Sequence, residues 1–105
     1  MGTDNGETIL RAAASTPVPE LSGAISGAVH DGKQVVIRAI GNGAVGQAVK
    51  AVAAARGHCA TRGIDLAIIP GFQTVDMPPS PGRRSGPTTA ITLRVITLNQ
   101  SHAVN

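Results

Sequence analysis

Three residues between a predicted strand and a predicted helix, Gly41, Asn42 and Gly43, could bind an anion. The preceding run is rich in β-branched residues and predicts a buried strand. From Ala44 onward, apolar residues recur at helical spacing and predict a helix that ends at Gly57. The N–H groups at the start of a helix are unpaired, and the helix dipole attracts negative charge there. A phosphate is therefore the ligand that this turn favours.

The same turn also matches the G-x-G-x-x-G pattern, from Gly41 to Gly46, that is typical of dinucleotide-binding sites. Such a site needs an acidic residue at the end of the next strand, whereas Asp65 precedes that strand, residues 66–69. The 105-residue chain is also too short for a separate substrate domain. These features disfavour a dinucleotide, and two interpretations of the glycines remain open, a structural tight turn and a phosphate contact.

Lys50 and the adjacent pair Arg83-Arg84 could contact further phosphates. The formal net charge of +3 favours polyanions. Lys50 is predicted on the helix face away from the apolar residues, and the arginine pair lies in residues 77–88, whose prolines and glycines predict a long projecting loop. A solvated surface position is the alternative for each. Phe72 is the single aromatic residue, so contacts to the nucleic-acid backbone are favoured over stacking on bases.

Arg38 alternates with Val36 and Ile40 along the predicted central strand. If that face of the strand is covered, the guanidinium needs a partner, because an unpaired buried charge is costly. We expect Asp65 or a neighbouring subunit to supply it. This interpretation of Arg38 is structural.

Polar and non-periodic ends predict a flexible N-terminal tail at residues 1–6 and a flexible C-terminal tail at residues 99–105, which leaves one domain at residues 7–98. Strands and helices alternate within it, in the order β-α-β-α-β-β. The predicted elements are a strand at 8–14, a helix from 19, a strand at 35–40, a helix at 44–57, a strand at 66–69 continued by a bent edge strand at 73–77, and a last strand at 89–98.

Catalytic and metal-binding patterns do not emerge from the sequence. The three histidines are scattered, and no paired carboxylates or nucleophile with a placed base are found. We therefore expect no enzyme, no cofactor and no metal. Cys59 is the single cysteine, which excludes an intramolecular disulfide and fits a reducing compartment. No apolar run approaches the ~18 residues of a membrane span, so we expect a cytoplasmic protein without a membrane partner.

The element order, together with the segments AIGNGAVGQAVKAVAAARG and GIDLAIIPGF, resembles the stage V sporulation protein S family, which is related to Alba-like nucleic-acid-binding proteins. The resemblance spans about residues 8–97, and its most specific part is residues 39–72. It implies an α+β fold, an Alba-like two-layer sandwich of two helices on a four-stranded mixed sheet.

The resemblance also implies a homodimer that grips duplex DNA or RNA. The matching positions are the turn Gly41–Gly43, Lys50 on the helix, and Arg83 and Arg84 in the hairpin. Ser15, Thr16 and Pro17 stand where archaeal Alba proteins usually have lysines, which implies a weaker affinity or a different ligand. The hairpin is also longer and richer in proline than is typical of the family.

Three functions follow as hypotheses. The first is a dimeric protein that contacts the nucleic-acid backbone with little sequence preference, with a regulatory role in bacterial sporulation or development. The second is a structural or regulatory module that self-assembles or binds protein. The third is a small-ligand or nucleotide-binding domain that uses the glycine turn. The alanine-rich second helix supports the first, since it permits close approach by a partner helix, although alanine is also the strongest helix former.

Overall fold

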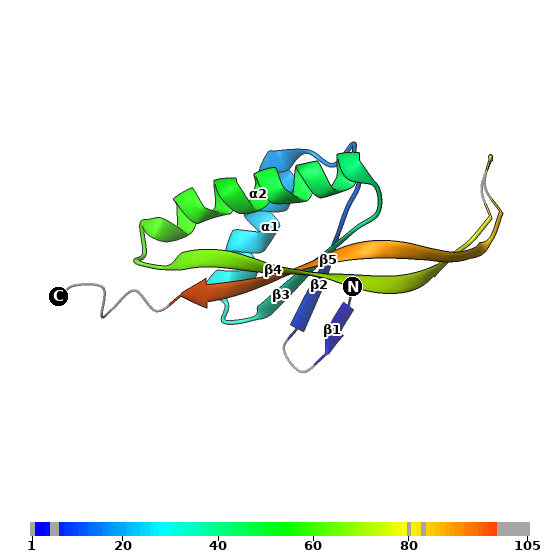
Figure 1. The fold of residues 1–105 in the computed structure, drawn as a ribbon. Helices are drawn as coiled ribbons and strands as arrows, with labels where there is room; N and C mark the ends of the chain where they lie inside the picture. Colours follow the sequence, from blue (N-terminus) through cyan, green and yellow to red (C-terminus); the bar gives the residue numbers. More distant parts are fainter. Residues whose placement is uncertain (1, 5–6, 80, 83, 99–105) are drawn as a thin grey trace.

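A computed structural model describes residues 2–4, 7–79, 81–82 and 84–98. The elements in chain order are β1 (Gly2–Asp4), β2 (Glu7–Ala12), α1 (Val18–His30), β3 (Gln34–Ala39), α2 (Asn42–Ala60), β4 (Asp65–Met77) and β5 (Gly86–Leu98). The strands form one sheet in the order β1-β2-β3-β5-β4, and both helices lie on the same side of it (Figure 1). The opposite face of the sheet is uncovered.

This architecture confirms the predicted α+β fold of two helices on a mixed sheet. β2 and β3 are parallel, and β5 is antiparallel to both β3 and β4. The parallel pair requires a crossover, which α1 supplies. β2 starts at residue 7 and β5 ends at residue 98, the residues between which one domain is predicted.

β1 adds a fifth strand to the four that the sequence predicts. Gly2–Asp4 pairs antiparallel with β2, with Gly2 opposite Ile9 and Asp4 opposite Glu7. The prediction of a flexible tail at residues 1–6 therefore differs from the structure at Gly2–Asp4. The physical reason is that the outer edge of β2 has backbone groups that β1 can pair. The predicted tail at residues 99–105 lies outside the described residues.

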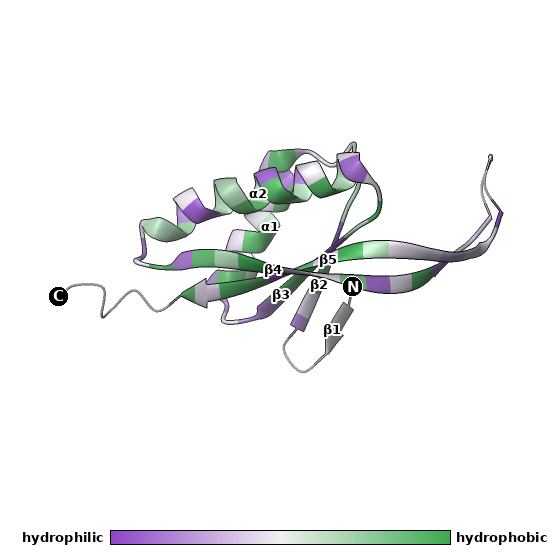
Figure 2. Cartoon of the chain, viewed as in Figure 1, coloured by the Kyte–Doolittle hydropathy of each residue, from purple (hydrophilic) through white to green (hydrophobic). Residues whose placement is uncertain are grey.

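Alternation along β3 separates the two faces of the sheet. Val35, Ile37 and Ala39 are at most 1 % exposed and lie beneath the helices, whereas Val36 and Arg38 lie on the uncovered face. Figure 2 shows that β4 and β5 are most hydrophobic where they run beside the helices and become more hydrophilic along the ribbon that extends beyond them. The core thus lies between the helices and the covered face of the sheet.

Helix α2 is longer than predicted, because it passes through Gly57 and ends at Ala60. A glycine ends a helix mainly when it takes a left-handed conformation, and here the glycine with positive φ is Gly63, at +74°. The Ile64 N–H donates to Cys59 O at 3.1 Å just after the helix. The glycine that terminates α2 is therefore Gly63 and not Gly57.

The buried face of α2 consists of small residues that pack within this chain. They are Ala44, Ala48, Ala51, Val52, Ala55 and Cys59. α1 and the sheet cover this face. Val49 is one of the apolar residues whose helical spacing predicts a buried face, but it is 43 % exposed. The alanine-rich helix therefore permits close approach of α1, and its buried alanines do not indicate a surface for a second subunit.

β4 is one continuous strand, although the sequence predicts a break at Pro70-Gly71. Pairing with β5 runs without interruption from Asp65 opposite Leu98 to Met77 opposite Gly86. β4 is the edge strand of the sheet, and an edge strand tolerates a proline because the missing N–H can face away from the partner. The predicted interruption at Pro70 is therefore wrong.

Beyond the helices, β4 and β5 continue as a two-stranded arm (Figure 1). The arm shortens the loop that was predicted over residues 77–88, because Met77 belongs to β4 and residues 86–88 belong to β5. The connection between the strands covers residues 78–85. In the described part of the chain, no helix is long and apolar enough to span a membrane.

Candidate functional site

The predicted turn lies where β3 ends and α2 begins. Gly41 precedes the helix with φ of +91°, a conformation that side chains rarely adopt. Its carbonyl accepts the first helical hydrogen bond, from Val45 N–H at 3.0 Å. Gly41, Asn42 and Gly43 are exposed, and no side chain caps the start of the helix. The backbone N–H groups in this turn can therefore donate to an anion.

The turn packs against the loop between β2 and α1. A Cβ on Gly43 would lie only 2.8 Å from the Cβ of Ala14, so glycine is required for this approach. Gln47 Nε2 donates to Thr16 O at 2.7 Å, and Thr16 Oγ1 accepts from Ala13 N–H at 2.8 Å. Gly43 thus has a structural role, one of the two interpretations of the turn, and α1 and α2 both start at the end of the sheet where the parallel strands β2 and β3 end.

Lys50 is exposed on α2, away from the buried face, as the helical spacing predicts. Its Nζ donates to Gln47 Oε1 at 3.4 Å. Lys50 lies about 10 Å along the helix axis from Gly43, at 1.5 Å per residue. The ammonium and the turn can therefore be reached by one extended polyanion.

Arg84 is exposed in the connection at the tip of the arm, and Arg83 lies outside the described residues. Figure 1 shows this tip at the far end of the ribbon from the helices. The structure therefore divides the predicted site residues into two places, with Gly41, Asn42, Gly43 and Lys50 on the body and Arg84 on the arm.

Three arginines on the uncovered face of the sheet were not predicted as site residues. Arg11 on β2 lies opposite Arg38 on β3, and Arg94 on β5 lies opposite Val36. Arg38 is half-buried, and its Nε is buried without a hydrogen-bond partner. Alternation in each strand could have placed each arginine on one face, but only the strand order and register bring the three together.

Asp65 is not the partner of Arg38 that the sequence predicts. It pairs instead with Arg56, whose Nη2 and Nε donate to Asp65 Oδ1 at 2.8 and 3.0 Å. Hydrogen bonding to Arg56 holds the pKa of Asp65 below its ordinary value, and the Leu66 N–H contributes in the same direction. Asp65 starts β4, at the end of the sheet away from the glycine turn, so Arg38 and Asp65 are separated by the length of β3.

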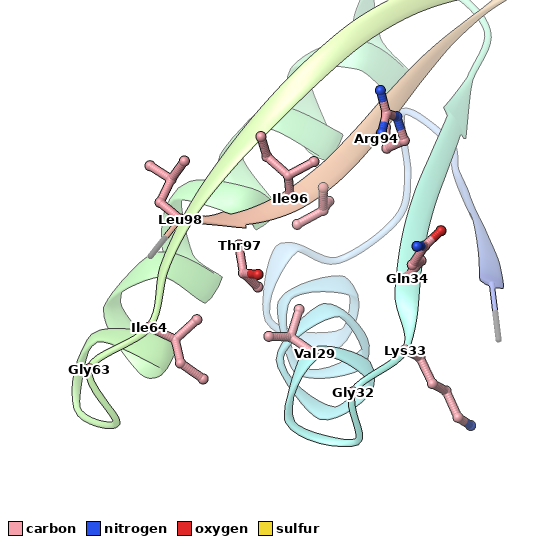
Figure 3. Close-up of a pocket in the computed structure, with 11 residues that line it drawn as sticks. Val29, Gly32, Lys33, Gln34, Gly63, Ile64, Arg94, Ile96, Thr97 and Leu98 are labelled. Carbon is pink, nitrogen blue, oxygen red and sulfur yellow. The ribbon is translucent and has the colours of Figure 1, made fainter. Parts of the chain in front are cut away.

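Cavities lie on the uncovered face and at the end of the sheet away from the turn. Two of them, of about 390 and 580 Å³, share Arg38 as a lining residue. A third, of about 640 Å³, lies between the carboxyl end of α1 and the end of β5. Figure 3 shows Val29 and Ile64 pointing into this third cavity, whereas Lys33 points away from it. Its lining combines apolar side chains, Val29 and Ile64 among them, with the polar side chains of Gln34, Arg94 and Thr97.

Large apolar side chains are exposed near the β4 edge and on α2. Phe72 is 81 % exposed, and Ile69, Val49 and Leu98 are each exposed by 42 or 43 %. Phe72 and Ile69 both belong to the edge strand β4. Exposed apolar residues along one edge favour a contact with another protein surface.

Comparison with known proteins gives a family and a structural neighbour. The family model for stage V sporulation protein S matches residues 8–98. Among solved structures, Alba from Thermoplasma volcanium is similar, with 16 % identity and a TM-score of 0.63. The alignment covers 84 % of this chain and 98 % of that chain. At this identity the similarity establishes a shared fold.

Proposed function

The chain belongs to the stage V sporulation protein S family, and we propose that it is a homodimeric protein that binds the backbone of duplex DNA or RNA with little sequence preference. Its role would be regulatory, in bacterial sporulation or development. The observation that most supports nucleic-acid binding is the exposed, uncapped glycine turn at the start of α2. A helix start of this kind suits a phosphate, and Lys50 on the same helix would neutralise another.

The arm supports the same proposal. β4 and β5 extend beyond the helices and place Arg84 at the end of a ribbon. A guanidinium at that position can form paired hydrogen bonds with phosphate oxygens. The body would therefore bind the backbone at the turn and at Lys50, while the arm would reach a more distant part of the same duplex.

The experiment is a fluorescence-anisotropy titration of nucleic-acid-free protein with a labelled random-sequence duplex at several salt concentrations. We expect submicromolar to micromolar binding that weakens steeply with salt. Lys50→Gln and Arg84→Gln should each reduce the slope of log K against log salt by about 0.9, the value for one phosphate contact. Arg62→Gln removes an exposed charge beyond the far end of α2 and serves as the matched control. If the slope of log K against log salt is the same in wild type and all variants, Lys50 and Arg84 do not contact the nucleic acid.

Phe72 supports a second candidate, a self-assembling interaction module that does not bind nucleic acid. An aromatic side chain that is 81 % exposed on an edge strand suits association with another protein surface. Oligomers that persist without nucleic acid, together with no duplex binding at low salt, would select this function. Duplex binding with a steep salt dependence would reject it.

A further inference from the structure

The uncovered face of the sheet brings three guanidinium groups together from neighbouring strands. Arg11 and Arg38 are direct cross-strand partners, and strands in a sheet are separated by about 4.8 Å. Arg94 is opposite Val36, two residues before Arg38, and its side chain therefore shares the uncovered face. Arg11 and Arg94 are exposed, and Arg38 is half-buried between them.

These positive charges have no ion-pair partner within the described part of the chain. The ion pair found there joins Arg56 to Asp65, at the other end of the sheet. Like charges placed directly opposite one another destabilise a sheet, so the Arg11–Arg38 pair is unfavourable by itself. Arg38 Nε is also buried without a hydrogen-bond partner. An anion that accepts hydrogen bonds from these arginines would remove both penalties.

Two cavities on this face have one lining residue in common, Arg38. Arg38 and Arg94 line the cavity of about 390 Å³ together with Thr92, the apolar Ile69 and one acidic residue, Glu7. Arg11 and Arg38 line the cavity of about 580 Å³, whose other wall includes Asp76 and Met77 from β4, so two arginines face one carboxylate there. The arginines are therefore next to the root of the arm.

We propose that Arg11, Arg38 and Arg94 form a phosphate-binding site on the uncovered face of the sheet, and that the phosphates belong to the backbone of the nucleic acid that the arm contacts. This inference rests on the proposed function. Guanidinium forks match the oxygens of a phosphodiester, and three of them on one face can neutralise successive phosphates of a strand. The nucleic acid would therefore also contact the side of the sheet that faces away from the helices, in addition to the turn and Lys50.

The experiment compares two double variants that lose the same charge. Arg11→Gln/Arg94→Gln removes the two exposed arginines of the site, and Lys33→Gln/Arg62→Gln removes two exposed charges from the opposite end of the sheet. Both sets are measured with a labelled DNA duplex and with the RNA duplex of the same sequence. The site variant should reduce the salt slope by about 1.8 and weaken binding roughly 60-fold at about 0.1 M salt, and the control variant should leave the slope unchanged.

The Arg38 Nε–H resonance provides a local measurement that does not depend on affinity. In nitrogen-15 labelled wild-type protein this resonance should shift when duplex is added, and the shift should be reduced in Arg11→Gln/Arg94→Gln. Equal slopes for the two double variants, with an unshifted Arg38 resonance, would overturn the site while the proposed function survives. A wild-type protein that binds neither duplex would overturn the proposed function and this inference together. Thermal unfolding of each variant checks that the fold is intact.

Discussion

Replacement of Gly43 by alanine should destabilise the protein, although alanine is the better helix former. The added Cβ would lie 2.8 Å from Ala14 Cβ, whereas ordinary contacts begin at 3.4 Å, so about 0.6 Å of movement is required. The loop that contains Ala14 is held by the hydrogen bond from Gln47 to Thr16, which resists this movement. Overpacking costs about 1 to 3 kcal/mol, and helix propensity returns at most about 1 kcal/mol. We expect a net loss of about 1 kcal/mol.

Gly46→Ala is the matched control, because a Cβ at Gly46 meets no atom within 4 Å. This variant should be more stable than wild type by up to about 1 kcal/mol. Urea unfolding measures both free energies, and for a domain of this size a difference of 1 kcal/mol changes Tm by about 4 °C. If Gly43→Ala is as stable as Gly46→Ala, the close packing between the turn and the first loop is refuted as the reason for glycine at this position.

Two further predictions concern the ion pair and the exposed aromatic residue. Because the pKa of Asp65 is lowered in the fold, its pairing with Arg56 stabilises the protein fully above the ordinary value of 3.8 and is lost as the pH falls through the lower folded value. Wild type should therefore lose more stability than Arg56→Gln on acidification from about pH 5 to about pH 2.5, measured by urea unfolding, and equal losses would contradict this. Phe72→Ser should weaken the proposed dimer, since each buried phenylalanine contributes about 1.5 to 3 kcal/mol, while Gln73→Ser on the same strand should not. Sedimentation at several protein concentrations measures both, and identical dimer fractions would exclude Phe72 from the interface.

The order of elements could be predicted because it depends on local patterns. The β-branched run before Gly41 predicts a strand, and the helical spacing after Gly43 predicts a helix, each from a few neighbouring residues. The breaks were less predictable, because their meaning depends on the surroundings. Pro70 would interrupt a central strand but is tolerated in an edge strand, and the sequence does not state which strand is at the edge.

The candidate site was predicted in part for the same reason. The turn from Gly41 to Gly43 is contiguous in sequence, so a local motif identifies it. The face formed by Arg11, Arg38 and Arg94 depends on the pairing of three strands that are far apart in sequence. Strand order and register arise from the packing of the whole domain, and a single chain read residue by residue does not contain them explicitly.

Both outer edges of the sheet are poor places for another strand to add. β1 has three residues, and β4 contains Pro70, which has no N–H to donate. The growth of a fibril by repeated backbone pairing needs a long, unbroken row of donors and acceptors, whereas β1 is short and the row on β4 is interrupted at Pro70. In the proposed dimer, a contact along β4 would therefore depend mainly on side chains such as the exposed Phe72, and each sheet would keep its own strand pairing.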